Sequence, residues 1–112
     1  MSTSALIAYK NEDGNYNVNS IHFDGYIDGV GKMLQENYND IEAAEEICDA
    51  DEIRSLEKTI IETEFYENYY MRKWRKNLSF EKLCNESGNF NFTYVFENGQ
   101  WFRLDNEELI NY

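Results

Sequence analysis

The sequence contains no proline, only two cysteines and a single histidine in 112 residues. Because proline commonly marks linkers, its absence leaves no sign of a domain boundary, and the length suits one domain with one modest core. A structural zinc site needs four ligands, which one histidine and two cysteines cannot supply without carboxylates. Cys48 and Cys84 have no second thiol or histidine at ligand spacing. We therefore expect two buried thiols, no metal and no cofactor.

Long apolar runs are also missing. No stretch approaches the length of a membrane span, and the first residues, MSTS, lack the basic start and apolar core of a secretory signal. These absences predict a cytoplasmic protein. Basic residues are scarce, with ten Lys and Arg against 22 Asp and Glu, for a net charge of -12. Nucleic acid and anionic membranes repel such a chain, so we expect neither as a direct partner.

Aromatic residues are abundant, with nine Tyr, seven Phe and two Trp, and the chain is too apolar for a disordered protein. Two hairpins are predicted. The first has strands at residues 5–10 and 16–23 around Asp13-Gly14, and the second lies in NFTYVFENGQWFRL around Asn98-Gly99. Both dipeptides tolerate the positive φ angles of a tight turn.

Three helices are predicted from apolar residues that recur at three- and four-residue steps. The first ends near Asn39, Asp40 is a suitable N-cap for the second, and Ser79 for a short third helix in SFEKLCNE. Asp51 could cap a further turn, and NEELINY is expected to be a short final helix or a tail. The expected buried stripes are Val30, Met33, Leu34 and Tyr38, then Ile41, Ala44, Ile47 and Cys48, then Phe80, Leu83 and Cys84.

The middle segment, IIETEFYENYYMRKWRKN, fits two alternatives. Aromatic residues at four-residue spacing fit a helix, whereas alternation and aromatic enrichment favour a strand. We predict a strand from about Glu67 to Arg75. Strands grouped in hairpins then predict an α+β fold, with residues 1–112 as a single domain. Its sheet would be mainly antiparallel, built from two hairpins plus the middle strand, with helices on one face.

The stretch HFDGYIDGVGK, residues 22–32, contains three glycines and two aspartates. Its glycines and lysine are spaced differently from those of a Walker phosphate loop and of the dinucleotide-binding pattern. The local interpretation is structural. Asp24-Gly25 would close a strand, Asp28 would cap a helix, and the glycines would let that helix approach the sheet closely.

The same stretch is also a candidate ligand site. A small molecule or nucleotide could bind at the turn from Gly25 to Gly31, lined by His22, Asp24 and Tyr26. His22 and Asp24 could in principle act as a base and its orienting carboxylate. However, no Ser or Cys lies nearby as a nucleophile, and the chain has no second histidine. We therefore expect a protein that is not an enzyme.

Acidic residues concentrate between Glu36 and Glu67, where twelve carboxylates stand against two basic residues, Arg54 and Lys58. On the predicted second helix they recur at three- and four-residue steps, a spacing of the order of that between phosphates on a nucleic-acid strand. Such a row could occupy the basic groove of a nucleic-acid-binding protein. The alternative is a solvated face that keeps the protein soluble. The candidate partner-binding residues are Glu42, Glu45, Glu46 and Asp49, with Asp51 and Glu52 beyond the helix.

Basic residues gather around one tryptophan in MRKWRKNLSFEK. Such a patch could stack on and neutralise a single nucleic-acid strand. The acidity of the remaining chain favours pairing with its own acidic helices, or a place at the edge of a protein interface. Arg72, Trp74 and Arg75 are the candidate interface anchors.

Three segments, STSALIAYKNEDGNY, IHFDGYIDGVGKMLQENYND and YVFENGQWF, resemble a family of small uncharacterised phage and prophage proteins. Members open with a similar Ser-x-x-LIA segment and carry His-Trp-Asp-Gly-Tyr before Gly-Val-Gly. The resemblance covers roughly the first 40 and the last 20 residues. Phe23 stands where members usually have Trp, and Ile27 where proline is common. The resemblance implies a strand followed by a helix in NYYMRKWRKNLSFEKL, and a phage genome as the source.

Together, the residues and this resemblance predict a small acidic phage accessory protein in the host cytoplasm. Its expected partner is a host protein that handles nucleic acid, such as a CRISPR or restriction effector that it inhibits. We expect the protein to be a monomer or a homodimer. The alternative is a small-ligand or nucleotide-binding module built on the glycine turn.

Overall fold

The computed structural model describes residues 2–67 and 75–112. Strands grouped in pairs alternate with short helices along the chain. The elements are β1 (Ala5–Lys10), β2 (Tyr16–Ile21), the π-helical turn η1 (Ile27–Gly31), α1 (Lys32–Asn37), α2 (Ile41–Asp49), β3 (Ile53–Ser55), β4 (Glu64–Phe65), α3 (Phe80–Ser87), β5 (Phe92–Glu97), β6 (Gln100–Asp105) and β7 (Glu108–Ile110).

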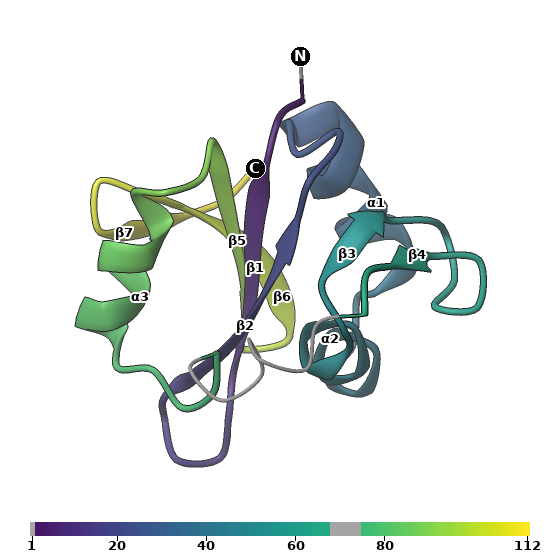
Figure 1. Ribbon diagram of the computed structural model, residues 1–112. Helices are drawn as coiled ribbons and strands as arrows, with labels where there is room; N and C mark the ends of the chain where they lie inside the picture. The colour runs from purple at the N-terminus through teal and green to yellow at the C-terminus, as the bar shows by residue number, and fades with distance from the viewer. Residues whose placement is uncertain (1, 68–74) are drawn as a thin grey trace.

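The seven strands of the described residues belong to one sheet, in the order β4-β3-β2-β1-β5-β6-β7. Four of the six neighbouring pairs are antiparallel, whereas β1 is parallel to β5 and β2 is parallel to β3. Strand β1 lies in the middle of the sheet and is buried from Ala5 to Tyr9 (Figure 1). The predicted α+β class and the mainly antiparallel sheet are therefore confirmed.

Both predicted hairpins are present. β1 pairs with β2 from Ala5–Ile21 to Lys10–Tyr16, and β5 pairs with β6 up to Glu97–Gln100. The turn residues have the positive φ angles that tight turns require, +80° at Gly14, +53° at Asn98 and +78° at Gly99. Turn chemistry alone was therefore sufficient to locate both pairs of strands.

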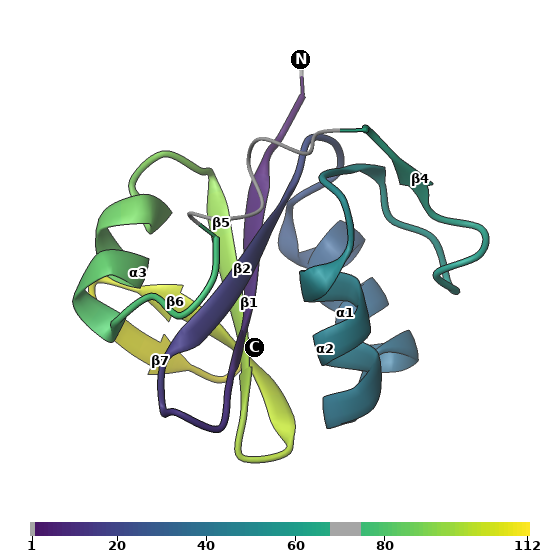
Figure 2. The same cartoon turned by 60° about the horizontal axis from the view of Figure 1, so that its bottom comes forward.

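The helices cover both faces of the sheet, whereas all of them were expected on one (Figure 2). Alternate residues of β1 point to opposite faces, as in any strand. Ala5, Ile7 and Tyr9 pack in the larger core with α1 and α2. Leu6 and Ala8 pack in the smaller core with Leu83 of α3.

The predicted helix caps are confirmed. The Asp40 side chain accepts a hydrogen bond from the backbone NH of Ala43 at 2.8 Å, and Ser79 Oγ accepts one from Lys82 at 3.2 Å. The stripes predicted for the second and third helices are only partly correct. In the second helix Ile41 is exposed, and in the third Leu83 is buried whereas Phe80 is exposed and Cys84 is half-buried. The first helix begins with η1, and Asp28 lies within that turn and does not cap it.

Three short strands were not predicted. Residues 53–55 form β3, where a capped turn was expected after Asp51, and residues 64–65 form β4, in the middle segment before the strand expected from Glu67. Residues 108–110 form β7, where a final helix or tail was expected. The strand expected from Glu67 to Arg75 falls almost entirely on residues 68–74, which lie outside the described residues.

Tyrosine hydroxyls join segments that are distant in the sequence. Tyr94 donates to the carbonyl of Gly25 at 2.7 Å, Tyr112 to Gly31 at 2.8 Å, and Tyr38 to Glu57 at 2.6 Å. Two others donate to carboxylates: Tyr9 to Asp49 at 3.0 Å and Tyr16 to Glu97 at 2.7 Å. Burial is the largest cause that raises the pKa of each of these five hydroxyls.

These raised pKa values predict a loss of stability in alkali. Above the ordinary tyrosine pKa of about 10, the unfolded chain releases protons that the folded chain retains. The stability contributed by the neutral hydroxyls is therefore complete below pH 10 and declines as the pH rises toward the folded-state values. Urea unfolding measured between pH 7 and 11.5 should show this decline. In Tyr94→Phe the decline should be shallower; equal slopes for the two proteins would contradict the role of Tyr94.

Candidate functional site

One buried side chain of the sheet holds the end of α2. Asn19 of β2 is fully buried, and its Nδ2 donates to the carbonyl oxygens of Ile47 at 3.0 Å, Ala50 at 3.3 Å and Asp51 at 2.9 Å. The last carbonyls of a helix have no partner within the helix, so Asn19 satisfies them from outside. Its Oδ1 accepts a hydrogen bond from the buried guanidinium of Arg75. This network fixes α2 against β2.

The outer face of α2 carries three of the predicted acidic residues. Ala44, Ile47 and Cys48 face the core, which leaves Glu42, Glu45 and Glu46 exposed on the opposite side of the helix. None of these three carboxylates forms a hydrogen bond or ion pair with residues 2–67 or 75–112. We call these three residues the α2 acidic row.

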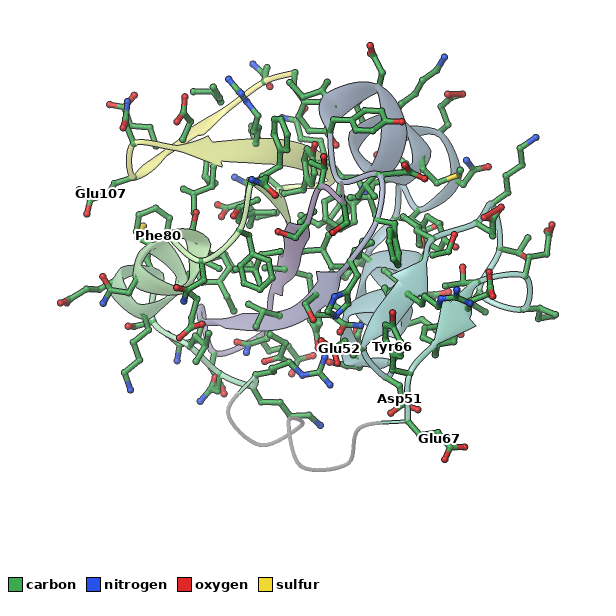
Figure 3. All side chains as sticks on the ribbon, turned by 45° about the horizontal axis from the view of Figure 1, so that its top comes forward. Asp51, Glu52, Tyr66, Glu67, Phe80 and Glu107 are labelled. Carbon is green, nitrogen blue, oxygen red and sulfur yellow. The ribbon has the colours of Figure 1, made fainter. Side chains whose placement is uncertain are left out.

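The other predicted acidic residues lie closer to the sheet and bind within the protein. Asp49 accepts hydrogen bonds from Tyr9 at 3.0 Å and from Asn17 at 3.4 Å. Asp51 and Glu52 are half-buried. Figure 3 shows both beside Tyr66 and Glu67, at the edge formed by β3 and β4. The structure therefore separates the six candidates into the α2 acidic row and a second group whose side chains interact within the protein, although Asp49 remains exposed.

His22 pairs with a residue that the sequence did not suggest. Its Nε2 lies 2.7 Å from Glu52 Oε1, which also accepts a hydrogen bond from Ser20 Oγ at 3.1 Å. The edge of the imidazole meets the ring of Tyr66, with the centroids 5.1 Å apart. Strand β2 ends at Ile21, so His22 and Asp24 do not share the face of a strand as expected. Glu52 lies 30 positions from His22 in the sequence, so the spacing of neighbouring residues could not predict this pair.

The glycine turn is built by close packing. An added Cβ at Gly25 would lie 2.7 Å from the backbone carbonyl of Ser4, and one at Gly31 would lie 3.0 Å from the Tyr94 ring. Asp24 has a positive φ of +58°, a conformation that aspartate tolerates better than most residues. The expected close approach of the turn to the sheet is thus present.

A cavity of about 190 Å³ opens at this turn. Asp24 and Tyr26 line it as predicted, but His22 does not. Among the described residues, no basic side chain lines it, whereas three carboxylates do. The lining residues are Phe23, Asp24, Tyr26, Asp28, Gly29, Val30, Met33, Leu56 and Glu57.

The predicted interface anchors give a different result. Arg72 and Trp74 lie outside the described residues, and Arg75 is buried against Asn19. Arg75 is therefore placed to support α2 and not to meet a partner at the surface. Arginine is suited to this position because its guanidinium stays charged and offers several donors in one plane.

No protein-family model, curated protein or solved structure matches this chain. Within residues 2–67 and 75–112, no group of three or more His, Cys, Asp or Glu side chains is arranged to hold a metal ion. None of the helices described is long and apolar enough to cross a membrane. The α2 acidic row and the cavities of the fold are therefore the features of the molecule that bear on its function.

The packing of the glycine turn predicts that Gly25→Ala destabilises the protein by about 1–3 kcal/mol, because the new methyl group would displace backbone atoms. Gly88→Ala is the matched control, since Gly88 has helical backbone angles and an added Cβ there would lie 3.3 Å from one carbonyl oxygen. Chemical unfolding followed by circular dichroism measures both. Equal stability of the two variants would contradict the structural role of Gly25.

Proposed function

We propose that this protein is a non-enzymatic phage accessory protein that inhibits a host nucleic-acid-handling protein by binding it through the α2 acidic row. The phage origin comes from the resemblance of the quoted motifs. The observation that carries the proposal is the exposure of Glu42, Glu45 and Glu46 without partners among the described residues. An anti-CRISPR or anti-restriction factor is its concrete form.

The charge distribution supports this choice of surface. Like charges in one row repel one another and so lower the stability of the helix that carries them. Within the described residues, no cation lies close enough to form an ion pair with this row, although Arg54 pairs with Glu64 and Lys32 with Glu36 elsewhere. A basic partner would relieve the repulsion and would be attracted over a long range.

The geometry of the row supports the proposal that it mimics nucleic acid. Side chains three and four positions apart on a helix have Cβ atoms about 5–6 Å apart. The Asn19 contacts hold the end of this helix, so the carboxylates are presented on a rigid element. A groove that binds successive phosphates would therefore meet several carboxylates at once.

Charge reversal tests the proposal. Wild-type protein should capture a nucleic-acid-handling protein from lysate of the host, and the triple variant Glu42→Lys, Glu45→Lys, Glu46→Lys should bind it at least about ten-fold more weakly, because like charges would then face each other. Asp49 is left intact because it binds Tyr9. The matched control is Glu81→Lys, Glu107→Lys, Glu108→Lys, which changes the charge equally at exposed positions. Glu107 lies far from Asp51 and Glu52 in Figure 3.

Competition with nucleic acid then separates mimicry from a general acidic contact. If the row occupies the nucleic-acid groove, added double-stranded DNA or RNA should release the captured protein. Retention of the partner by the α2 variant, or equal loss in both triple variants, would disprove the proposal. If no nucleic acid displaces the partner, mimicry is excluded, and the α2 acidic row remains only as the binding surface.

The cavity at the glycine turn favours a second candidate function, the binding of a small cation. Asp24, Asp28 and Glu57 supply negative charge, and the rings of Phe23 and Tyr26 are exposed beside them. Ammonium and guanidinium groups are attracted both to carboxylates and to aromatic faces. The same charges disfavour the nucleotide that the sequence left open.

Thermal unfolding with added ligand tests this second function. 1,4-Diaminobutane should raise the melting temperature of the wild-type protein, and ADP should not. Tyr26→Ala should abolish the increase, because the variant removes one wall of the cavity. Tyr66→Ala is the control, since Tyr66 is also exposed but does not line the cavity. An equal increase in all three proteins would indicate a general salt effect and exclude the site.

A further inference from the structure

Two hollows meet at the beginning of α2. The larger, of about 550 Å³, lies between the start of this helix and the turn joining β5 to β6. The smaller, of about 260 Å³, lies between the helix and the turn joining β1 to β2. Lys10, Asn11 and Ile41 line both. We call the combined depression the Ile41 groove.

Ile41 is an apolar side chain in an exposed position. It is the first residue of α2, and 48% of it is accessible to solvent. The walls around it are ordered by their own hydrogen bonds. In the turn joining β1 to β2, Asn11 Oδ1 accepts hydrogen bonds from the backbone NH groups of Asp13 and Asn15. In the turn joining β5 to β6, Asn98 and Gly99 have the positive φ angles of a tight turn. The groove therefore exists before any partner arrives, which lowers the entropic cost of binding.

The charges that line the groove are predominantly negative. In the part of the chain that the structure describes, the lining contains four carboxylates, those of Glu12, Asp40, Glu45 and Glu97, and one cation, Lys10. Lys10 lies 3.9 Å from Glu97, so these two charges offset each other. Glu45 also belongs to the α2 acidic row, so the groove and the row form one continuous surface. An anionic ligand or a second copy of this acidic chain would be repelled.

We propose that the Ile41 groove is the docking site for a basic segment of the partner protein, with one aliphatic side chain packed against Ile41 and flanking Lys or Arg residues paired with the groove carboxylates. The proposal rests on the proposed function, because it assigns to the same partner an anchor beside the α2 acidic row. Charge alone would make binding strong only at low salt, whereas burial of an aliphatic side chain persists when salt screens the charges. The groove thus adds selection for a protein segment over other polycations.

Two synthetic peptides of equal charge test the docking site. Acetyl-Lys-Arg-Leu-Arg-Lys-amide carries the aliphatic side chain, and acetyl-Lys-Arg-Ser-Arg-Lys-amide lacks it. Each is titrated into the full-length protein labelled with ¹³C at isoleucine methyl groups. The leucine peptide should shift the Ile41 methyl resonances and bind about five- to ten-fold more tightly, as expected for partial burial of one leucine. Ile41→Ser should remove this preference.

Ile61 provides the matched control, because it is also an isoleucine, is 92% exposed and lies outside the groove. Ile61→Ser should retain the preference for the leucine peptide. Equal affinities of the two peptides for wild type, or a preference that survives in Ile41→Ser, would overturn the docking site. Either result leaves the lysate experiment unaffected, because that experiment tests the α2 acidic row. If charge reversal of the α2 acidic row leaves capture from lysate unchanged while the peptide preference holds, the proposed function is refuted and the docking site is not.

Discussion

The position of α2 depends on one buried amide. Asn19 reaches from the middle of the sheet to three carbonyl groups at the end of this helix, and its oxygen accepts from Arg75. A buried polar side chain is tolerated only when it is fully hydrogen-bonded, and in that state it specifies one arrangement of its neighbours. Because α2 carries the acidic row and begins at the Ile41 groove, this contact inside the protein sets the geometry of the surface outside it.

The protein uses its acidic residues in two different ways. Some act inside the fold: Asp40 caps α2, Asp49 accepts from Tyr9, and Glu52 binds Ser20 and His22. These carboxylates contribute to structure, and their removal would be expected to disturb it. The α2 acidic row contributes no such contact within residues 2–67 and 75–112, so no hydrogen bond or ion pair there offsets its negative charge. The net charge of the chain is therefore a poor guide to function until each carboxylate has been placed.

The turns and helix caps could be predicted because each depends on a few residues that are adjacent in the sequence. The turns at Asp13-Gly14 and Asn98-Gly99 and the caps Asp40 and Ser79 each depend on a few adjacent residues, and all are present. Strands of two or three residues have no alternation to detect, so β3, β4 and β7 were missed. The side of the sheet that α3 covers, and the pairing of His22 with Glu52, depend on contacts between distant parts of the chain. The acidic row was found because helical spacing separates Glu42, Glu45 and Glu46 from the buried stripe. The hydrogen bonds of Asp49 with Tyr9 and of Glu52 with Ser20 depend on strand residues that are distant in sequence.

The central place of β1 has a consequence for biosynthesis. Its two neighbours come from opposite parts of the chain, β2 directly after it and β5 near the other end, and Ser4 and Asn91 are hydrogen-bonded partners 87 positions apart. One edge of β1 therefore stays unpaired until β5 has been synthesised. Contacts at such separation slow folding, and an unpaired apolar edge is prone to join other strands. A ribosome must synthesise the chain through β5, which ends at Glu97, before this sheet can close around β1, so chaperone cover of the exposed edge would protect the nascent protein until then.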